Sequence, residues 1–257
     1  MLHHVDHTRM GRGRHGWLDS YFHFSFAEYF NPENIRFGIL RVLNDDIVQT
    51  GAGFTTHPHE NMEIVSYVVQ GELSHKDSMG NVHTLTRGQA QYMSAGTGVT
   101  HSELNWGPTE LRFMQMWILP DKQGYTPNYG DHRFVWEDRI DKWLPMATSY
   151  DNAANAANAA PIKVHADINL YAAVLSAGES IDFKLGPDRQ AYMTLLEGDA
   201  QVENIKMIER DALEIIKQDV TMTTERYAHL YVLEMPFDER HYKQRFGEQT
   251  PPSYERV

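Results

Sequence analysis

Two short segments of the chain carry side chains that could bind a metal ion. His57 and His59 lie two positions apart, and His101 and Glu103 repeat this spacing about forty residues later. On a β-strand, successive side chains alternate between faces, so residues two apart point the same way. Each pair can therefore direct two ligand atoms toward one point, and two pairs on facing strands predict one shared site.

The two pairs together offer three imidazole nitrogens and one carboxylate oxygen. This donor set suits Fe(II), Mn(II), Co(II), Ni(II), Cu(II) or Zn(II). The chain has no cysteine, so thiolate ligands are excluded and a closed structural zinc site is disfavoured. Four protein ligands on an octahedral ion would leave two positions open. We therefore expect a single open metal site that can admit substrate, water or O₂.

Other residues near these pairs allow different interpretations. Glu63 has the same strand parity as His59 if the strand continues without a bulge, so the residues alone leave Glu63 and Glu103 both open as the carboxylate ligand. We prefer Glu103 and interpret Glu63 as a residue that supports a ligand. Other histidines are interpreted as ordinary ones, with His75 and His83 as hairpin residues. His3, His4 and His7 form a metal-capable cluster, but near a chain end we interpret it as solvated.

Short strands must position these side chains. Runs of apolar and β-branched residues end at Gly, Asn, Asp or Pro at intervals of about ten residues, which is typical of an all-β sandwich or barrel. The clearest runs cover 37–43, 63–69, 111–119, 168–175, 191–196 and 230–235.

The second half of the chain contains a weak internal repeat of the first. Residues 65–73 resemble residues 192–200, with Gly71 matching Gly198 at an offset of 127. This similarity favours duplicated barrels. The same offset places no metal-capable side chain at the positions equivalent to the two pairs, so we predict a second barrel without metal. Those equivalent positions are Lys184, Gly186, Ala228 and Leu230.

Length and composition fit a two-domain protein. A chain of 257 residues suits two domains, which we place at 1–140 and 141–257, with an Asn/Ala-rich loop at 151–160 near the boundary. The net charge of −12 disfavours direct nucleic-acid binding. No apolar stretch reaches membrane-spanning length and the N-terminus lacks the apolar core of a signal peptide, so we expect a cytoplasmic protein that does not enter a membrane.

The metal-capable segments resemble the two motifs of the cupin superfamily. The first runs through Gly51, His57, His59, Glu63 and Gly71, and the second through Gly88, Gly96, His101 and Asn105. Further segments resemble the pirin family within that superfamily, and the match spans Gly16 to Pro120 almost continuously. These segments are 15–20, 24–26, 40–46, 57–67, 72–81, 93–98 and 101–105.

The resemblance implies a bicupin, that is, two tandem jelly-roll-like β-barrels with a metal in the N-terminal one. It implies His57, His59, His101 and Glu103 as the ligands, and it favours Glu103 over Glu63. It is strongest to bacterial pirin-like proteins with quercetinase activity, which implies a flavonol 2,3-dioxygenase that consumes O₂ and releases carbon monoxide. Fe(II) is our first choice of metal, with Ni, Cu, Co, Mn or Zn as alternatives.

In such an enzyme, Glu103 would also act as the catalytic base toward the flavonol 3-hydroxyl. The alternative function is a metal-dependent, non-enzymatic regulator that binds a protein partner such as a transcription factor, as some pirin-like proteins do. A vestigial metal site that only stabilises the fold is the third hypothesis.

Overall fold

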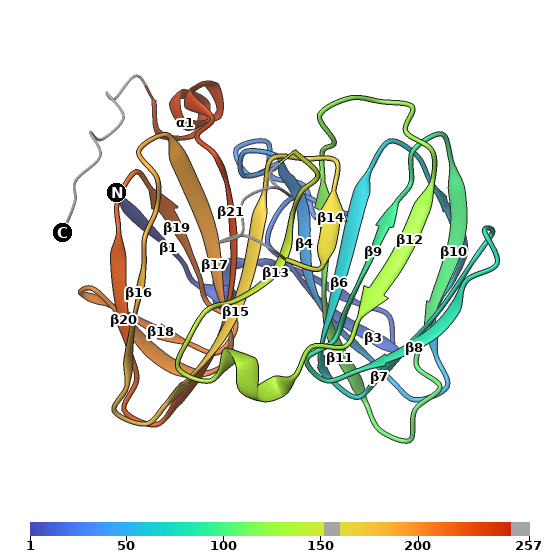
Figure 1. Ribbon diagram of the computed structural model, residues 1–257, viewed down its shortest axis with the longest axis horizontal. Coiled ribbons are helices and arrows are strands. Elements are labelled where there is room, and N and C mark those ends of the chain that lie inside the picture. Colours follow the sequence, from blue (N-terminus) through green and yellow to red (C-terminus); the bar gives the residue numbers. More distant parts are fainter. Residues whose placement is uncertain (152–159, 248–257) are drawn as a thin grey trace. The chain divides into compact units, whose positions relative to one another are not determined.

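The computed structural model describes residues 1–151 and 160–247, and within them β-strands dominate, so the all-β prediction is confirmed. The chain divides into two compact units (Figure 1). The first unit contains Met10–Phe134 and Pro161–Ala166, and the second contains the described parts of Met1–Arg9, Val135–Ala160 and Asp167–Val257. The predicted loop at 151–160 lies, except for its two end residues, outside the described residues.

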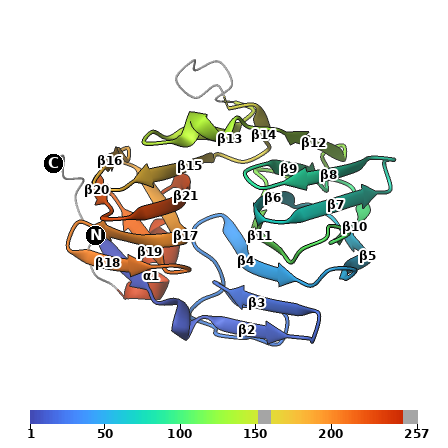
Figure 2. The same cartoon turned by 90° about the horizontal axis from the view of Figure 1, so that it is seen from below.

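The first unit is built from two antiparallel sheets. One has the strand order β5-β10-β7-β8, and the other has the order β12-β9-β6-β11-β4-β3-β2 (Figure 2). Its strands are β2 (Gly11–Arg14), β3 (Leu18–Phe22), β4 (Leu40–Val48), β5 (Gly53–His59), β6 (Glu63–Gln70), β7 (Glu72–Asp77), β8 (Val82–Thr86), β9 (Ala90–Ser94), β10 (Val99–Leu104), β11 (Leu111–Ile118), β12 (Asn128–His132) and the short β14 (Ile162–Val164).

The predicted apolar runs occupy the centre of the larger sheet. Strand β6 pairs with β9 on one side and with β11 on the other, and seven of its eight residues are buried. Val68 and Phe113 from this sheet pack with Leu73 and Leu85 from the smaller sheet. Burial of this apolar surface between the sheets fixes where the smaller sheet lies, and the smaller sheet carries the two metal-capable pairs.

The second unit is also antiparallel. Its larger sheet includes the run β1-β19-β17-β21-β15-β13, and the end of the long strand β17 also pairs with β18 and β20. The elements are β1 (Leu2–Val5), two 3₁₀ turns (His7–Arg9 and Trp136–Arg139), β13 (Leu144–Ser149), β15 (Asn169–Ser176), β16 (Ser180–Phe183), β17 (Arg189–Val202), β18 (Ile205–Ile208), β19 (Ala212–Ile216), β20 (Val220–Thr223), β21 (Tyr227–Pro236) and α1 (Glu239–Phe246).

The chain's first strand pairs with β19, some 210 residues later, with Leu2 opposite Ile215. The first nine residues therefore lie in the second unit. We keep residue 140 as the proposed boundary between two domains. The placement of the first strand in the second unit is a further finding, which local sequence patterns do not predict.

The glycines that define the internal repeat have the same local role in both units. Gly71 and Gly198 have φ values of 79° and 85°. A Cβ atom at either position would lie 2.5 Å or less from a backbone carbonyl oxygen, that of Glu110 or Tyr227. Only glycine fits such a conformation at such a close approach.

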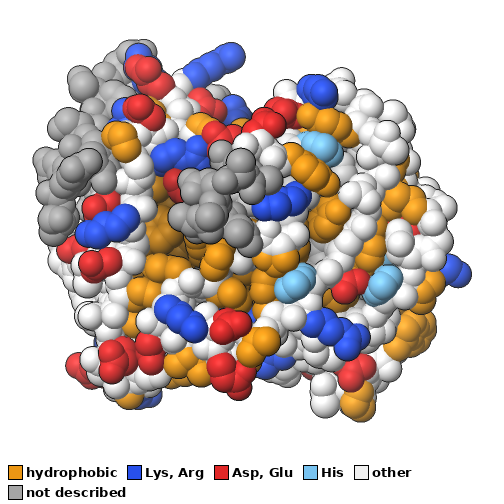
Figure 3. Space-filling view, in the orientation of Figure 1, with side chains coloured by type: hydrophobic (Ala, Val, Ile, Leu, Met, Phe, Trp, Pro, Cys, Tyr) orange, Lys and Arg blue, Asp and Glu red, His pale blue; other side chains and the backbone are white. Residues whose placement is uncertain are grey.

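Two broader observations concern the surface. Within the part of the chain that the structure describes, none of the helices has the length and apolar character needed to cross a membrane. On the face drawn in Figure 3, acidic and basic side chains of the described residues are interspersed rather than gathered by sign.

Candidate metal centre

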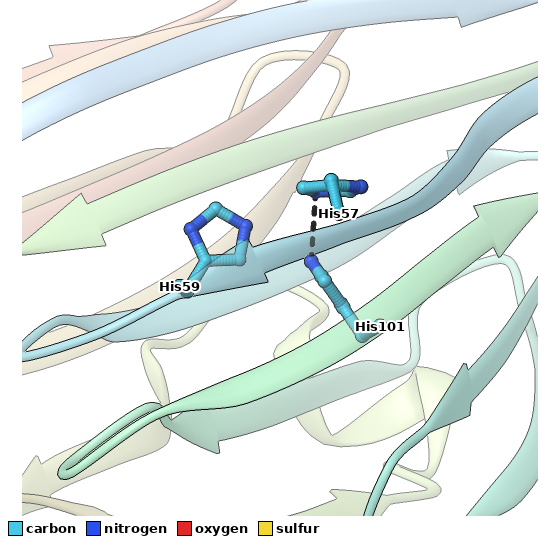
Figure 4. Close-up of side chains that lie close together, drawn as sticks. All are labelled: His57, His59 and His101. Carbon is cyan, nitrogen blue, oxygen red and sulfur yellow. Dashed lines mark hydrogen bonds between the residues drawn. The ribbon is translucent and has the colours of Figure 1, made fainter.

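Neighbouring strands bring three of the four predicted ligands together. In the register of β5 with β10, His101 lies opposite His57, and Val99 lies opposite His59. The three imidazoles point toward one another (Figure 4), with ring centroids 4.5 to 4.9 Å apart. One nitrogen from each of His57, His59 and His101 lies within 4.8 Å of the other two.

The hydrogen bonds of these rings indicate which nitrogens face the shared site. His57 Nδ1 lies 2.7 Å from the carbonyl oxygen of Thr55, which can only accept, so Nδ1 carries the proton and the lone pair is on Nε2. His59 Nε2 is buried and has no hydrogen-bond partner among the described residues. A buried nitrogen without a partner is costly, and a metal ion would satisfy it.

The site also favours neutral imidazoles, the form that binds metals. Burial, together with repulsion from His101 and His57, lowers the pKa of His59 to about 4, although Glu103 opposes the shift. Burial likewise lowers the pKa of His101 to about 3, with added repulsion from His57 and His75. Both rings are therefore uncharged near neutral pH.

The spacing of the nitrogens fits a transition-metal ion. Nitrogens bound at 2.0–2.1 Å with angles of 90–110° lie about 2.9–3.4 Å apart. His57 Nε2 and His101 Nε2 are 3.1 Å apart. The donor set and this distance both fit one mononuclear ion.

Glu103 occupies a neighbouring position. It groups with His101 and His75 within 4.8 Å, and so shares His101 with the group of three imidazoles without joining His57 and His59. Its Oε1 accepts hydrogen bonds from Ser66 Oγ at 2.9 Å and from Gln91 Nε2 at 2.8 Å, and its Oε2 accepts one from Gln115 Nε2. These donors fix the orientation of the carboxylate.

His75 is a residue that the sequence interpretation missed. It lies opposite His83 in the β7–β8 hairpin, as predicted, but it is buried, and its ring lies 5.5 Å from that of His101. His75 Nε2 contacts Asp77 Oδ2 at 3.1 Å. The signal was present in the sequence, because His75 and Asp77 are a further pair two positions apart on a strand.

Glu63, the rival carboxylate, is engaged elsewhere. Its Oε1 accepts a hydrogen bond from Ser94 Oγ at 2.6 Å, and its Oε2 accepts one from the backbone N–H of His165 at 3.1 Å. Burial raises the pKa of this carboxyl, although both hydrogen bonds oppose the rise. Glu63 belongs to neither group of potential ligands in the first unit.

A β-bulge in β5 sets which side chains share the site's face. His101 pairs with His57, but Glu103 pairs with Phe54, so β5 has one residue more than β10 over this stretch. The extra residue lies at Thr55 and Thr56, both of which are exposed. Because of the bulge, Phe54 and His57 lie on the same face although they are three positions apart.

A pocket lies next to His57 within the first unit. Its volume is about 480 Å³, and its walls include the aromatic side chains of Trp17, Phe22, Phe26, Phe54 and Trp117. Aromatic walls combined with polar groups are typical of sites for flat organic ligands. A second, wider hollow of about 570 Å³ reaches His59 from another side.

The N-terminal histidines are partly exposed, in line with the interpretation of a solvated chain end, but His4 and His7 are also tied to the second unit. His4 Nε2 contacts Asp211 Oδ2 at 3.0 Å, and His7 Nδ1 contacts Asp211 Oδ1 at 2.8 Å. Asp6, His7 and Asp211 are the one group of three potential ligands that the described residues of the second unit contain. The comparison of the two halves of the sequence at an offset of 127 residues did not point to any of these three residues.

Fold and site together define a two-domain cupin protein with a potential metal centre in its N-terminal half. Residues 4–118 match the family model described as Pirin, and residues 153–235 match the model described as Quercetinase C-terminal cupin domain. The chain belongs to the pirin family, and the bicupin prediction is confirmed.

Relatives and solved structures agree with this assignment. A protein from Escherichia coli (strain K12) named quercetin 2,3-dioxygenase is 37% identical over 229 residues, which cover 88% of this chain and 95% of the relative. A pirin-like protein from Caulobacter vibrioides is 37% identical over 216 residues, covering 84% and 91%.

Two crystal structures of YhhW from Escherichia coli are similar over nearly the whole chain. One has a TM-score of 0.84 at 34% identity and covers 92% of this chain and 98% of its own. The other, of YhhW in complex with nickel(II), has a TM-score of 0.82 at 33% identity and covers 92% and 99%.

Proposed function

We propose that this chain is a metal-dependent dioxygenase that cleaves quercetin or a related flavonol at the 2,3-bond and releases carbon monoxide. The observation that carries the proposal is the group of three imidazoles, with a bare nitrogen on His59, beside a pocket walled by aromatic rings. The names of the relatives, most of them putative quercetin 2,3-dioxygenases, support it.

His57, His59 and His101 would hold the ion, with Glu103 as the fourth ligand. Fe(II) remains our first choice, and Ni, Cu, Co, Mn and Zn fit the same donors. When bound, the ion supplies Lewis acidity that lowers the pKa of a flavonol hydroxyl.

The chain's own residues would do the rest. The Glu103 carboxylate accepts the proton of the flavonol 3-hydroxyl, and the amides of Gln91 and Gln115 hold that carboxylate in place. The Trp17 and Phe54 rings, which meet edge to face with centroids 5.3 Å apart, orient a flat ligand and exclude water from it.

The proposal extends to the setting of the reaction. A flavonol-like aromatic and O₂ would be the substrates, with neither nucleic acid nor membrane involved. A chain without cysteine fits the reducing cytoplasm, where we place the protein.

The test is turnover by metal-loaded protein. Protein loaded separately with Fe, Mn, Co, Ni or Cu is mixed with quercetin without O₂, and air is then admitted. We expect O₂-dependent loss of the flavonol absorbance with release of carbon monoxide for at least one metal. A His59→Ala variant should be inactive, and a variant at the exposed His132, His132→Ala, should behave as wild type. A metal-loaded wild type that consumes no quercetin with any of these metals would overturn the proposal, and metal-dependent binding of a protein partner would then be the alternative to examine.

A further inference from the structure

One wall of the aromatic pocket is polar. Asn44 and Asp46 of β4 both line the pocket. They lie two positions apart and so on the same face of the strand. Ser20 of β3 lies opposite Asp46 and also lines the pocket. The polar wall therefore consists of three side chains from two adjacent strands of the larger sheet.

Asn44 is buried without a partner. Only 2% of it is exposed, and its Oδ1 has no hydrogen bond within the described part of the chain. Exchanging the oxygen and nitrogen of the amide would not remove the problem, since no side-chain hydrogen bond of Asn44 is present in either sense. A buried amide that lines a pocket and lacks a protein partner is placed to bind a polar group of a ligand.

Asp46 is half satisfied. Ser20 Oγ donates to its Oδ1, and among the described residues no donor reaches Oδ2. The carboxyl is only 2% exposed, and burial raises its pKa to about 7, with Asp45 and Glu103 adding to the rise and Ser20 opposing it. Because no donor from the described part of the chain reaches Oδ2, this oxygen is a further acceptor on the polar wall when the carboxyl is ionised.

The polar wall is joined to the candidate metal centre. Asn44 lies directly opposite Gln115 in the register of β4 with β11. Gln115 lines the pocket and donates its amide to Glu103. A ligand that contacts Asn44 therefore lies beside Gln115, the residue that holds the candidate base Glu103.

We infer that Asn44 and Asp46 form a subsite that binds hydroxyl groups on the ring system of a polyhydroxylated aromatic ligand. The inference rests on the proposed function, which supplies the flavonol ring system as the ligand. It adds that flavonols with further hydroxyl groups are the preferred substrates. Hydroxyl groups donate to the Asn44 oxygen and to Asp46 Oδ2, so an analogue without them leaves both buried acceptors unpaired. Sites that hydrogen-bond a substrate hydroxyl reject the analogue lacking it far more strongly than apolar pockets reject an extra one.

The test compares two flavonols by binding rather than by turnover. Dissociation constants for quercetin and for 3-hydroxyflavone, which keeps only the 3-hydroxyl, are measured without O₂ on metal-loaded protein, from the quenching of tryptophan fluorescence. We expect the wild type to prefer quercetin by at least tenfold, and Asn44→Leu to reduce that preference by about tenfold. Asp46→Asn, a change of nearly equal size that keeps an acceptor, should reduce it less. Asn204→Leu makes the same chemical change at an exposed position of the second unit and should leave the preference intact.

Each outcome is decisive. An unchanged preference in a folded Asn44→Leu protein and in Asp46→Asn overturns the subsite, as does a wild type that binds the two flavonols equally or binds neither. The proposed dioxygenase stands or falls separately: a protein that prefers quercetin through Asn44 but does not consume it in air keeps the subsite and loses the dioxygenase.

Discussion

Histidines cluster in both units, but their ring nitrogens meet different partners. In the first unit, His57, His59 and His101 face one another, and a ligand nitrogen of His59 has no partner among the described residues. In the second unit, His4 and His7 both contact the carboxylate of Asp211.

The comparison separates ligand-ready imidazoles from structural ones. The Asp211 carboxylate also accepts hydrogen bonds from the backbone N–H groups of His7 and Ile208, so both of its oxygens are already used. Imidazoles that face one another and include a buried nitrogen without a partner among the described residues are placed to bind a cation. Imidazoles tied to a saturated carboxylate hold strands together instead. Proximity of potential ligands alone does not distinguish the two, since Asp6, His7 and Asp211 also lie within 4.8 Å of one another.

The largest expected effect follows from removing a ligand of the first group. His101→Ala should lower metal affinity by more than about 100-fold, beyond the 10–100-fold typical of residues that only support a ligand. Metal content per chain, measured after dialysis, should fall from one equivalent to nearly none. His4→Ala serves as the matched control and should retain one equivalent. If His101→Ala keeps its metal and His4→Ala loses it, the N-terminal histidines are the metal ligands and the comparison is wrong.

A smaller loss is expected at a residue that supports Glu103. Gln115→Leu removes the donor to Glu103 Oε2 and should lower metal affinity by about 10–100-fold. Titration with a competing chelator measures the change. The exposed Gln49 provides the control, Gln49→Leu, with no expected change. Equal affinity in Gln115→Leu and wild type would show that Glu103 does not depend on this amide.

The second unit should respond in stability rather than in metal binding. Asp211→Ala leaves two imidazoles and two backbone N–H groups without their acceptor and should destabilise the unit by about 1–3 kcal/mol. Calorimetry should show unfolding at a lower temperature, while metal content stays at one equivalent per chain. Asp188→Ala, at an exposed position of the same unit, should change neither. Loss of metal in Asp211→Ala would mean that the second group is a true metal site.

His23 is a buried histidine of the first unit that is not a potential metal ligand, so it shows the effect of burial alone. Burial lowers the pKa of His23 from 6.5 to about 4, with Asp45 opposing the shift, yet His23 belongs to no group of potential ligands. As the pH falls below 6.5, the unfolded chain takes up a proton that the folded chain does not. The contribution of His23 to the free energy of unfolding is therefore fully present above pH 6.5 and is lost at about 1.4 kcal/mol per pH unit as the pH falls toward 4.

The measurement is the pH dependence of the free energy of unfolding in urea. His23→Gln should reduce its slope between pH 6.5 and 4, and His132→Gln, at an exposed position, should not. Identical slopes in wild type and His23→Gln would show that His23 takes up its proton in the folded protein as readily as in the unfolded one.

The sequence predicted those features that depend on local periodicity. Alternation along single strands was enough to place His57 beside His59 and to identify the central strands at 63–69 and 111–119. Alternation also put His101 and Glu103 on one face, but it could not show that three amide and hydroxyl donors hold Glu103 next to His75 instead of beside His59. The resemblance to pirins narrowed the choice between Glu63 and Glu103, and the hydrogen bonds of Glu63 to Ser94 and His165 agree with that choice.

The features that the sequence did not predict depend on contacts between distant segments. The pairing of β1 with β19 joins residues some 210 positions apart, and no local pattern specifies it. The role of Asp211 follows from that pairing, so the contacts of the N-terminal histidines could not be predicted from their neighbours in the sequence. Asn44 and Asp46 were part of the resemblance, but their place on a pocket wall needed the register of β4 with β3 and β11.

The bulge in β5 has a consequence for insertions and deletions in this strand. Because Thr55 and Thr56 together oppose a single residue of β10, one half of β5 supplies imidazoles and the other half supplies an aromatic wall on the same face. Deleting one of these threonines would leave Phe54 two positions from His57, so strict alternation would keep both side chains on the same face without a bulge. The bulge thus absorbs one surplus residue, and β5 can lose it while keeping its imidazoles and its aromatic wall on the same face.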